Sequence, residues 1–201
     1  MPADLLVVGL GNPGEEYAKT RHNVGAEVVE LLARRHGIRL KKHRRDRALV
    51  GDARVDGRFL ALAIPVTWMN DSGMAVAPLA RRFEVGPEQL VVVHDELDLP
   101  PAALRVKMGG GLAGHNGLRS ITQHLHSQDF LRVRIGVGKP PSKERGANHV
   151  LSGFSKRDRE QIAVTLEEAA DAVELILTDG VEAAMNRYNG RSATGSGDTE
   201  K

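Results

Sequence analysis

The sequence predicts an α/β fold: a single globular domain with a mixed, twisted β-sheet and helices on both faces. Two all-apolar segments, residues 5–10 and 90–93, have the pattern of strands buried on both faces of a parallel sheet. Strand-like and helix-like segments alternate along the chain, as in α/β proteins. Asp56-Gly57 joins two strand-like segments directly, which is typical of an antiparallel hairpin and makes the sheet mixed.

The elements follow from apolar periodicity and from turn residues. Beyond residues 5–10 and 90–96, strands are expected at 38–43, 49–55, 59–64, 104–108 and 130–137. Helices are expected at 24–36, from about 70 to 83, at 118–125, from 156 to about 179, and at 181–189. Pro78 cannot donate a backbone hydrogen bond, so its helix either kinks there or begins near Ala77. Residues 140–148 read as a polar loop, and Ser155 opens a capping box.

Length and composition bound the class of protein. The 201 residues fit one domain at residues 1–189, and residues 190–201, rich in Gly, Ser, Thr and charge, are expected to form a disordered tail. The absence of cysteine excludes disulfide and thiolate chemistry and indicates a reducing compartment. No leader sequence and no apolar run near ~18 residues are present, so we expect a soluble, cytoplasmic protein without a membrane partner.

Charge is concentrated in one place. The formal net charge is only +2, but residues 39–47 (RLKKHRRDR) form a dense basic run. Such a run can meet phosphate groups electrostatically, or it can simply be a solvated strand end. Both interpretations remain open from the sequence.

The segment 9–14 (GLGNPG) imitates a dinucleotide-binding fingerprint. In a true fingerprint a helix begins at the second or third glycine, so that its N-terminus meets the pyrophosphate. Here Pro13 lies inside the motif, and helical periodicity begins only at Val24. We therefore interpret Gly9 and Gly14 as turn glycines. An NADP-binding oxidoreductase remains a minor alternative, because the next predicted strand ends in basic residues.

Polar side chains gather at predicted strand ends and loop tips: Asn12, His22, Asn70, Asp95 and Asn116. In open α/β sheets such groups meet at the carboxyl ends of the parallel strands. A histidine beside a carboxylate is the arrangement of a general base, and asparagine amides can donate to a developing oxyanion. No serine or cysteine occupies a nucleophile elbow, so water is the expected nucleophile. The polar residues adjacent to this set are Asn23, Asp98 and His115.

A metal site is the rival use of the acidic segment after the second apolar strand. His94, Asp95, Glu96 and Asp98 are all possible ligands. Consecutive strand residues point to opposite faces, however, so His94 and Asp95 cannot easily share one ion. We expect no metal and no cofactor.

Several blocks in order resemble the bacterial-type peptidyl-tRNA hydrolases. They are residues 7–14 (VVGLGNPG), Tyr17, 20–23 (TRHN), 69–73 (MNDSG), 94–100 (HDELDLP), 109–111 (GGG), 114–118 (GHNGL) and 132–136 (RVRIG). Any one block is a weak signal, but together they are highly specific. They cover roughly residues 5 to 180.

This resemblance implies hydrolysis of the ester that joins a peptide to the 3′ ribose of tRNA, which recycles tRNA from abandoned translation. It implies that His22 activates water and that Asp95 orients His22. Asn12 and Asn70 would hold the peptide and the scissile carbonyl, and Asn116 would position water. The remaining implied contacts are Tyr17 and Met69 in the pocket, and Lys107 and Arg134 on the tRNA 5′-phosphate.

The implied partner is the acceptor end of peptidyl-tRNA, and a monomer is the default state. An alternative from another class is a non-catalytic tRNA-binding module, which would bind with a steep dependence on salt but release no peptide. A peptidyl-tRNA cleavage assay distinguishes the two.

Overall fold

The fold is one mixed β-sheet with helices on both faces, as the sequence predicts. The computed structural model describes residues 1–190, in which seven strands form a sheet in the order β2-β3-β4-β1-β5-β7-β6. Of the predicted C-terminal tail, residues 190–201, all but Gly190 lie outside the described residues. No helix in the described part of the chain has the length and apolar character needed to cross a bilayer.

The four central strands of the sheet are parallel, and antiparallel strands flank them. The strands are β1 (Leu5–Gly9), β2 (Lys41–His43), β3 (Ala48–Val55), β4 (Arg58–Pro65), β5 (Leu90–Glu96), β6 (Leu104–Met108) and β7 (Leu131–Gly136). β1 pairs in parallel with β4 and β5, and β5 with β7. β3 and β6 run antiparallel to β4 and β7. The carboxyl ends of β4, β1, β5 and β7 therefore meet at one rim.

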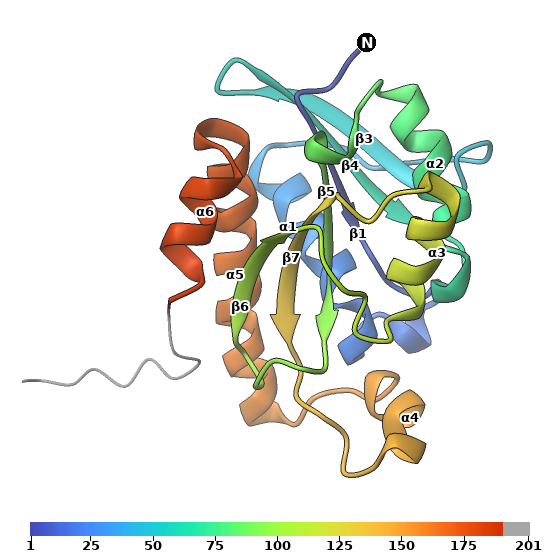
Figure 1. Cartoon of the computed structure of the whole chain (residues 1–201), viewed down its shortest axis with the longest axis vertical. Coiled ribbons are helices and arrows are strands. Elements are labelled where there is room, and N and C mark those ends of the chain that lie inside the picture. The colour runs from blue at the N-terminus through green and yellow to red at the C-terminus, as the bar shows by residue number, and fades with distance from the viewer. Residues whose placement is uncertain (191–201) are drawn as a thin grey trace, which may run out of the picture.

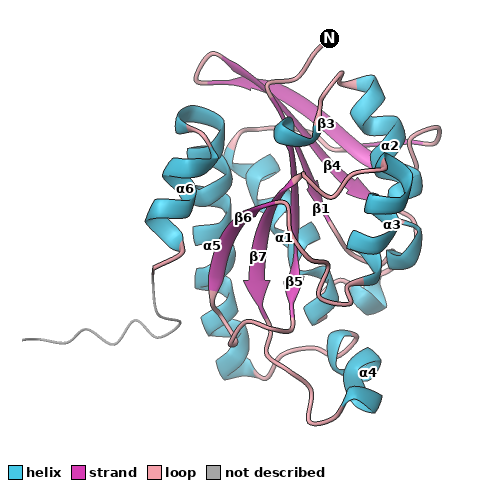
Figure 2. Ribbon diagram, in the orientation of Figure 1, coloured by secondary structure: helices cyan, strands magenta, loops and turns pink. Residues whose placement is uncertain are grey.

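Two layers of helices cover the sheet (Figures 1 and 2). The helices are α1 (Val24–Arg35), α2 (Gly73–Arg82), α3 (Asn116–Leu125), α4 (Gly146–Val150), α5 (Lys156–Asp179) and α6 (Val181–Tyr188). α1, α5 and α6 pack on one face, and α2 and α3 pack on the other. Short 3-10 turns join these elements at η1 (Glu15–Tyr17), η2 (Arg21–Asn23), η3 (Met69–Asp71), η4 (Pro87–Gln89) and η5 (Lys143–Arg145).

The core has two halves, separated by the sheet. Because side chains alternate along a strand, Val7 and Val93 pack towards α1 and α5, whereas Leu6, Val8 and Val92 pack towards α2 and α3. All five side chains are fully buried. β1 and β5 are thus apolar on both faces, and chemistry must lie beyond their ends.

Several local predictions differ from the structure. β2 begins at Lys41, because Ile38 remains tied to α1 through its N–H, which donates to the Ala33 carbonyl at 2.8 Å. α2 begins at Gly73, so the later start near Ala77 is wrong; the Gly73 N–H is fixed by the Ser120 hydroxyl of α3 at 2.9 Å. The predicted loop 140–148 contains η5 and the start of α4.

A close approach between two glycines sets the position of the first helix. A Cβ on Gly9 would lie 2.2 Å from the Gly25 carbonyl oxygen, and a Cβ on Gly25 would lie 2.0 Å from that of Val93. α1 therefore rests directly on the carboxyl ends of β1 and β5. Gly9 lies inside β1 and not in a turn, so our interpretation of it was wrong, whereas Gly14 adopts a positive φ of 104°.

Candidate active site

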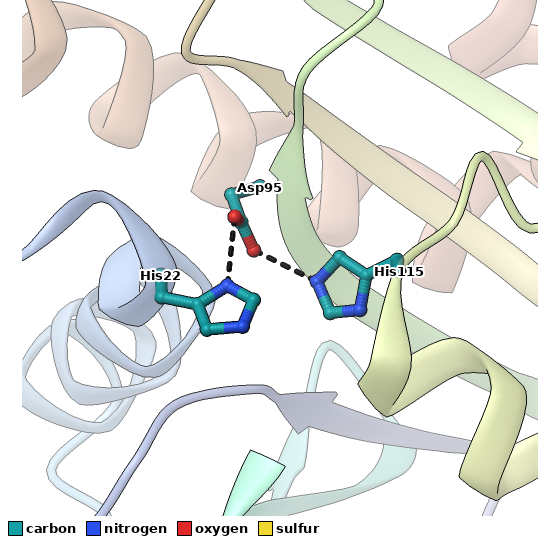
Figure 3. Close-up of side chains that lie close together, drawn as sticks. All are labelled: His22, Asp95 and His115. Atoms are coloured by element: carbon teal, nitrogen blue, oxygen red, sulfur yellow. Dashed lines mark hydrogen bonds and ion pairs between the residues drawn. The ribbon is translucent and has the colours of Figure 1, made fainter. Parts of the chain in front are cut away.

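Asp95 is the centre of a buried polar cluster at the rim of the sheet. It is the penultimate residue of β5, and the residue is only 2% exposed. η2 approaches it from the α1 side, and the loop before α3 approaches from the other side (Figure 3). Its two carboxylate oxygens consequently face different elements.

His22 is the first partner of Asp95. It lies in η2, three residues before Gly25, so the close packing of α1 on β5 brings its ring over the strand end. His22 Nδ1 lies 2.8 Å from Asp95 Oδ2. A carboxylate can only accept, so Nδ1 carries the proton and Nε2 bears the lone pair of the neutral ring. Nε2 has no hydrogen-bond partner among residues 1–190, and 11% of the side chain is exposed.

His115 is the second partner, on the opposite carboxylate oxygen. His115 Nε2 lies 2.8 Å from Asp95 Oδ1. His115 is also the N-cap of α3, where its Nδ1 accepts the N–H groups of Gly117 at 3.1 Å and Leu118 at 3.3 Å. Because Nδ1 accepts, Nε2 must be the protonated nitrogen that donates to Asp95.

These donors keep Asp95 ionised. Burial by itself would raise the pKa of the carboxyl group, but His115 and His22 outweigh it and hold the pKa well below its usual range. A buried carboxylate with two N–H donors at 2.8 Å is fixed in orientation as well as in charge. The cluster is therefore a histidine whose tautomer is set by an ionised carboxylate, which is the arrangement of a general base.

His94 is a third histidine beside this cluster, and it is also buried. Its Nδ1–H donates to the backbone carbonyl of Asp95 at 2.7 Å, and its ring centre lies 5.1 Å from that of His115. Burial and the neighbouring His115 lower the pKa of His94 to about 3, so the ring stays neutral. Its Nε2 is buried without a partner in the described chain.

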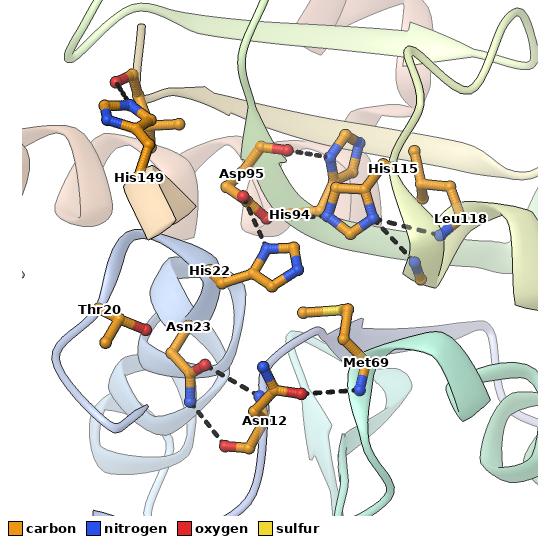
Figure 4. Close-up of polar contacts among 12 residues, drawn as sticks. Asn12, Thr20, His22, Asn23, Met69, His94, Asp95, His115, Leu118 and His149 are labelled. Carbon is orange, nitrogen blue, oxygen red and sulfur yellow. Dashed lines mark hydrogen bonds and ion pairs between the residues drawn. The ribbon is translucent and has the colours of Figure 1, made fainter. Parts of the chain in front are cut away.

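Asn12 lies in the loop that follows β1, and three hydrogen bonds hold it. The Asn23 side chain makes two hydrogen bonds to the Asn12 backbone, both of 2.9 Å: its Oδ1 accepts the Asn12 N–H, and its Nδ2 donates to the Asn12 carbonyl. Asn12 Oδ1 accepts the Met69 N–H at 2.7 Å. Since the oxygen is engaged, the Nδ2 amide is the group left without a partner in residues 1–190. Figure 4 shows this amide and the Met69 side chain on the side of His22 that faces away from Asp95.

The other predicted side chains lie around this space but are not bonded to the cluster. Met69 is buried, and Tyr17 makes an edge-on contact with the exposed Trp68 at 5.9 Å between ring centres. Asn70 and Asn116 are exposed and make no side-chain hydrogen bond among the described residues. Asn70 belongs to η3 and Asn116 is the first residue of α3, and these two elements pack together.

Lys107 and Arg134 lie on β6 and β7, on the same face of the sheet edge. The register pairs Lys107 with Arg132 and Arg105 with Arg134, so four cations lie on two neighbouring strands. Arg134 Nε and Nη2 donate to Glu96 at 3.0 and 2.7 Å. Lys107 has no ion pair within residues 1–190. Like charges directly opposite each other destabilise a sheet, so this face is suited to an anion.

The basic run 39–47 lies at the opposite side of the sheet, on β2 and the turn before β3. Its one acid, Asp46, is buried and pairs with Arg82 of α2 at 2.5 Å. Three strands, β3, β4 and β1, separate β2 from β5. Contact between this run and RNA therefore remains a prediction.

The comparisons with known proteins identify the family. A model of the peptidyl-tRNA hydrolase family matches residues 6–196. This chain belongs to that family. Peptidyl-tRNA hydrolase from Nocardia farcinica is 53% identical over 184 residues, covering 92% of this chain and 95% of that relative. The Mycobacterium marinum protein of the same name is 51% identical over 189 residues, covering 94% and 99%. A crystal structure of the Acinetobacter baumannii peptidyl-tRNA hydrolase matches with a TM-score of 0.90 at 40% identity, covering 96% of this chain and 99% of that chain.

The resemblance to peptidyl-tRNA hydrolases is thus confirmed. The structure also adds two residues to the polar cluster that the sequence did not place in it. His115 and Asn23 were expected only as neighbours, yet His115 binds Asp95 and Asn23 holds Asn12. Their signal was available in the sequence: each directly adjoins a predicted site residue. What the sequence lacked was the direction of each side chain.

The alternatives can be compared with the same geometry. After the glycine loop come η1 and η2, and α1 begins only at Val24, so no helix starts at the second or third glycine as a dinucleotide-binding fingerprint requires. Among residues 1–190, His22, Asp95 and His115 form a group compact enough to hold a metal ion. The possible ligands named from the sequence, His94, Asp95, Glu96 and Asp98, form no such group in the described residues. An ion that used the two ring nitrogens now facing Asp95 would replace both of their protons.

Proposed function

We propose that this chain hydrolyses the ester of peptidyl-tRNA with a water molecule that His22 activates. Its family supplies the reaction: hydrolysis of the bond between the peptide carbonyl and the tRNA 3′ oxygen. The observation that carries the assignment of the base is the His22 ring itself. Its Nδ1 is held by an ionised Asp95, and its Nε2 is open.

In the proposed step, His22 Nε2 removes a proton from water as the water oxygen attacks the ester carbonyl carbon. The developing imidazolium is stabilised by Asp95, which keeps its own negative charge. The bond from the carbonyl carbon to the ribose oxygen then breaks. His22 returns the proton to that oxygen, so the products are a peptide carboxylic acid and tRNA.

Asparagine side chains are assigned to the substrate. Asn12 has its Oδ1 engaged by Met69, so Nδ2 supplies an N–H donor next to the open face of His22. We assign this donor to the scissile carbonyl, whose oxygen becomes negative during attack. Asn70 is assigned to the peptide and Asn116 to the attacking water. Their exposure supports these roles, because both amides remain free for a ligand.

Two further contacts complete the substrate site. Tyr17 and Met69 are assigned to the wall of the pocket for the ester and its flanking groups. Lys107 and Arg134 are assigned to the 5′-phosphate of tRNA, supported by the cations that lie opposite one another on β6 and β7. Phosphate contacts of this kind set the register of a nucleic acid and leave the chemistry to the neighbouring site. We place the protein in the cytoplasm, acting as a monomer.

The test is release of an N-blocked amino acid from charged tRNA by the purified protein. The assay is run under single-turnover conditions, with the ester substrate at a concentration well below that of the protein. The expected result is release of the N-blocked amino acid. Binding without release would instead support a non-catalytic tRNA-binding module. An untreated and a chelator-treated sample, run side by side, report on any metal requirement.

A further inference from the structure

His115 is the polar group of the cluster for which the proposed reaction has no task. Its ring centre lies 5.0 Å from that of His22, but within residues 1–190 the two rings share no hydrogen bond, and both ring nitrogens of His115 are occupied. The residue is 9% exposed. A histidine buried with every ring nitrogen engaged is unsuited to proton transfer with substrate.

The bonds of His115 instead connect a helix end to the carboxylate of Asp95. Two backbone N–H groups of α3 point at Nδ1, which leaves Nε2–H as a permanent donor. This donor occupies Asp95 Oδ1 at 2.8 Å. The other oxygen, Oδ2, is then the one available to His22. The orientation of α3 is thereby transmitted to the carboxylate.

The loop before His115 is itself held by a buried arginine. Arg132 is 1% exposed, and its guanidinium donates to the backbone carbonyls of Gly110, Gly111 and Gln128. The segment 109–116 is therefore fixed at one end by Arg132 and at the other by the α3 cap. His115 cannot easily move away from Asp95.

We propose that His115 is a positioning residue for the hydrolase reaction, which fixes Asp95 so that His22 is held in the Nδ1–H tautomer with Nε2 open to water. This inference rests on the proposed function. His115 acts through Asp95 and does not touch the substrate.

The decisive variant is His115→Asn. Asparagine is among the best N-cap residues, so its side-chain oxygen can still accept from the first turn of α3. It cannot cap the helix and also reach Asp95 with an N–H donor, because its side chain is shorter than histidine. The variant thus removes the bond to Asp95 and keeps the cap. His124→Asn is the matched control, an exposed histidine on the same helix that bonds only its own Ser120 carbonyl.

We expect His115→Asn to lower kcat by about 10-fold or more with little change in KM, which is typical of lost support for a catalytic group. His124→Asn should leave both unchanged. In an Asp95→Asn background, adding His115→Asn should cause almost no further loss, because the two residues act as one unit. An unchanged kcat in His115→Asn, or full additivity in the double variant, would overturn the proposal.

A measurement independent of activity separates this inference from the proposed function. In ¹⁵N-detected histidine spectra, we expect His115 as the Nε2–H tautomer and His22 as the Nδ1–H tautomer in the intact protein. His22 should become a mixture of tautomers in His115→Asn and stay unchanged in His124→Asn. An unchanged His22 tautomer in His115→Asn contradicts the positioning role. Absence of peptide release by the intact protein contradicts the proposed function alone.

Discussion

The polar residues of this protein fall into two regions that differ in what already binds them. Around Asp95, His22, His94 and His115 are buried, and hydrogen bonds from within the chain hold each ring. Outside this cluster, Asn70, Asn116 and Lys107 are exposed or half-exposed, and none has an internal side-chain partner among the described residues. Asn12 lies between the two sets, with one end of its amide engaged and the other free.

The buried groups are ordered before the substrate binds, whereas the exposed groups are free to bind it. Groups that are ordered before substrate binds lose little freedom during the reaction and act with fixed charge. Groups without internal partners gain their bonds only when the substrate arrives. We therefore expect changes in the buried set to lower kcat, or to alter stability, and changes in the exposed set to weaken binding.

The largest expected effect is that of His22→Ala. Loss of a positioned base lowers a rate by about 10²–10⁴-fold, so kcat should fall by this factor while the thermal midpoint and circular dichroism stay close to those of the intact protein. Peptide release under single-turnover conditions measures it. An undiminished rate would remove His22 from the mechanism.

Asn12→Asp tests the residue between the two regions. Aspartate retains an oxygen that accepts the Met69 N–H, but it replaces the free Nδ2 donor with a second oxygen. Loss of one oxyanion donor reduces kcat by about 10²–10³-fold, and we expect a fall of that order. Asn12→Ala provides the comparison without added charge. If only KM rises in both variants, Asn12 belongs with the exposed binding groups.

Burial of His94 should make the stability of the folded protein sensitive to acid, an effect that the exposed residues do not share. The pKa of His94 is about 3 in the folded protein, against about 6.5 in an unfolded chain. Above pH 6.5 both states are neutral; below it, only the unfolded state takes up the proton, so the free energy of unfolding falls as the pH drops towards 3. Between pH 7 and pH 5 this amounts to about 2 kcal/mol.

Urea unfolding at pH 7 and at pH 5 measures this loss in the free energy of unfolding. His94→Gln should reduce the loss of stability between pH 7 and pH 5 by about 2 kcal/mol. His126→Gln, at an exposed position, is the matched control and should reproduce the intact protein. Equal acid sensitivity in all three proteins would show that His94 is not the group responsible.

The smallest expected effect comes from the exposed set. Lys107→Gln removes one proposed phosphate contact, which should weaken tRNA binding a few-fold and reduce the slope of log affinity against log salt by about 1. The kcat at saturating substrate should not change. Arg54→Gln, at an exposed position near the far end of β3, controls for the loss of general positive charge. A fall in kcat would instead show that Lys107 contributes to catalysis and not only to tRNA binding.

The sequence by itself determined most of the architecture and named the residues of the proposed site. Apolar runs, glycines and turn residues act locally, so β1, β5, β6, α1 and α5 begin and end within a residue or two of their predicted limits. The motif blocks also named His22, Asp95 and Asn12, because residue identity is written directly in the chain.

Only the tertiary structure decided how these residues engage one another. Residues 22, 95 and 115 meet because a glycine contact draws α1 onto β5 and a buried arginine holds the loop before α3. A contact of the same kind fixes the start of α2, where the Gly73 N–H donates to the Ser120 hydroxyl. Such bonds join residues that are tens of positions apart, and side-chain direction depends on packing that no local pattern contains. The tautomers of His22 and His115 follow from those bonds alone.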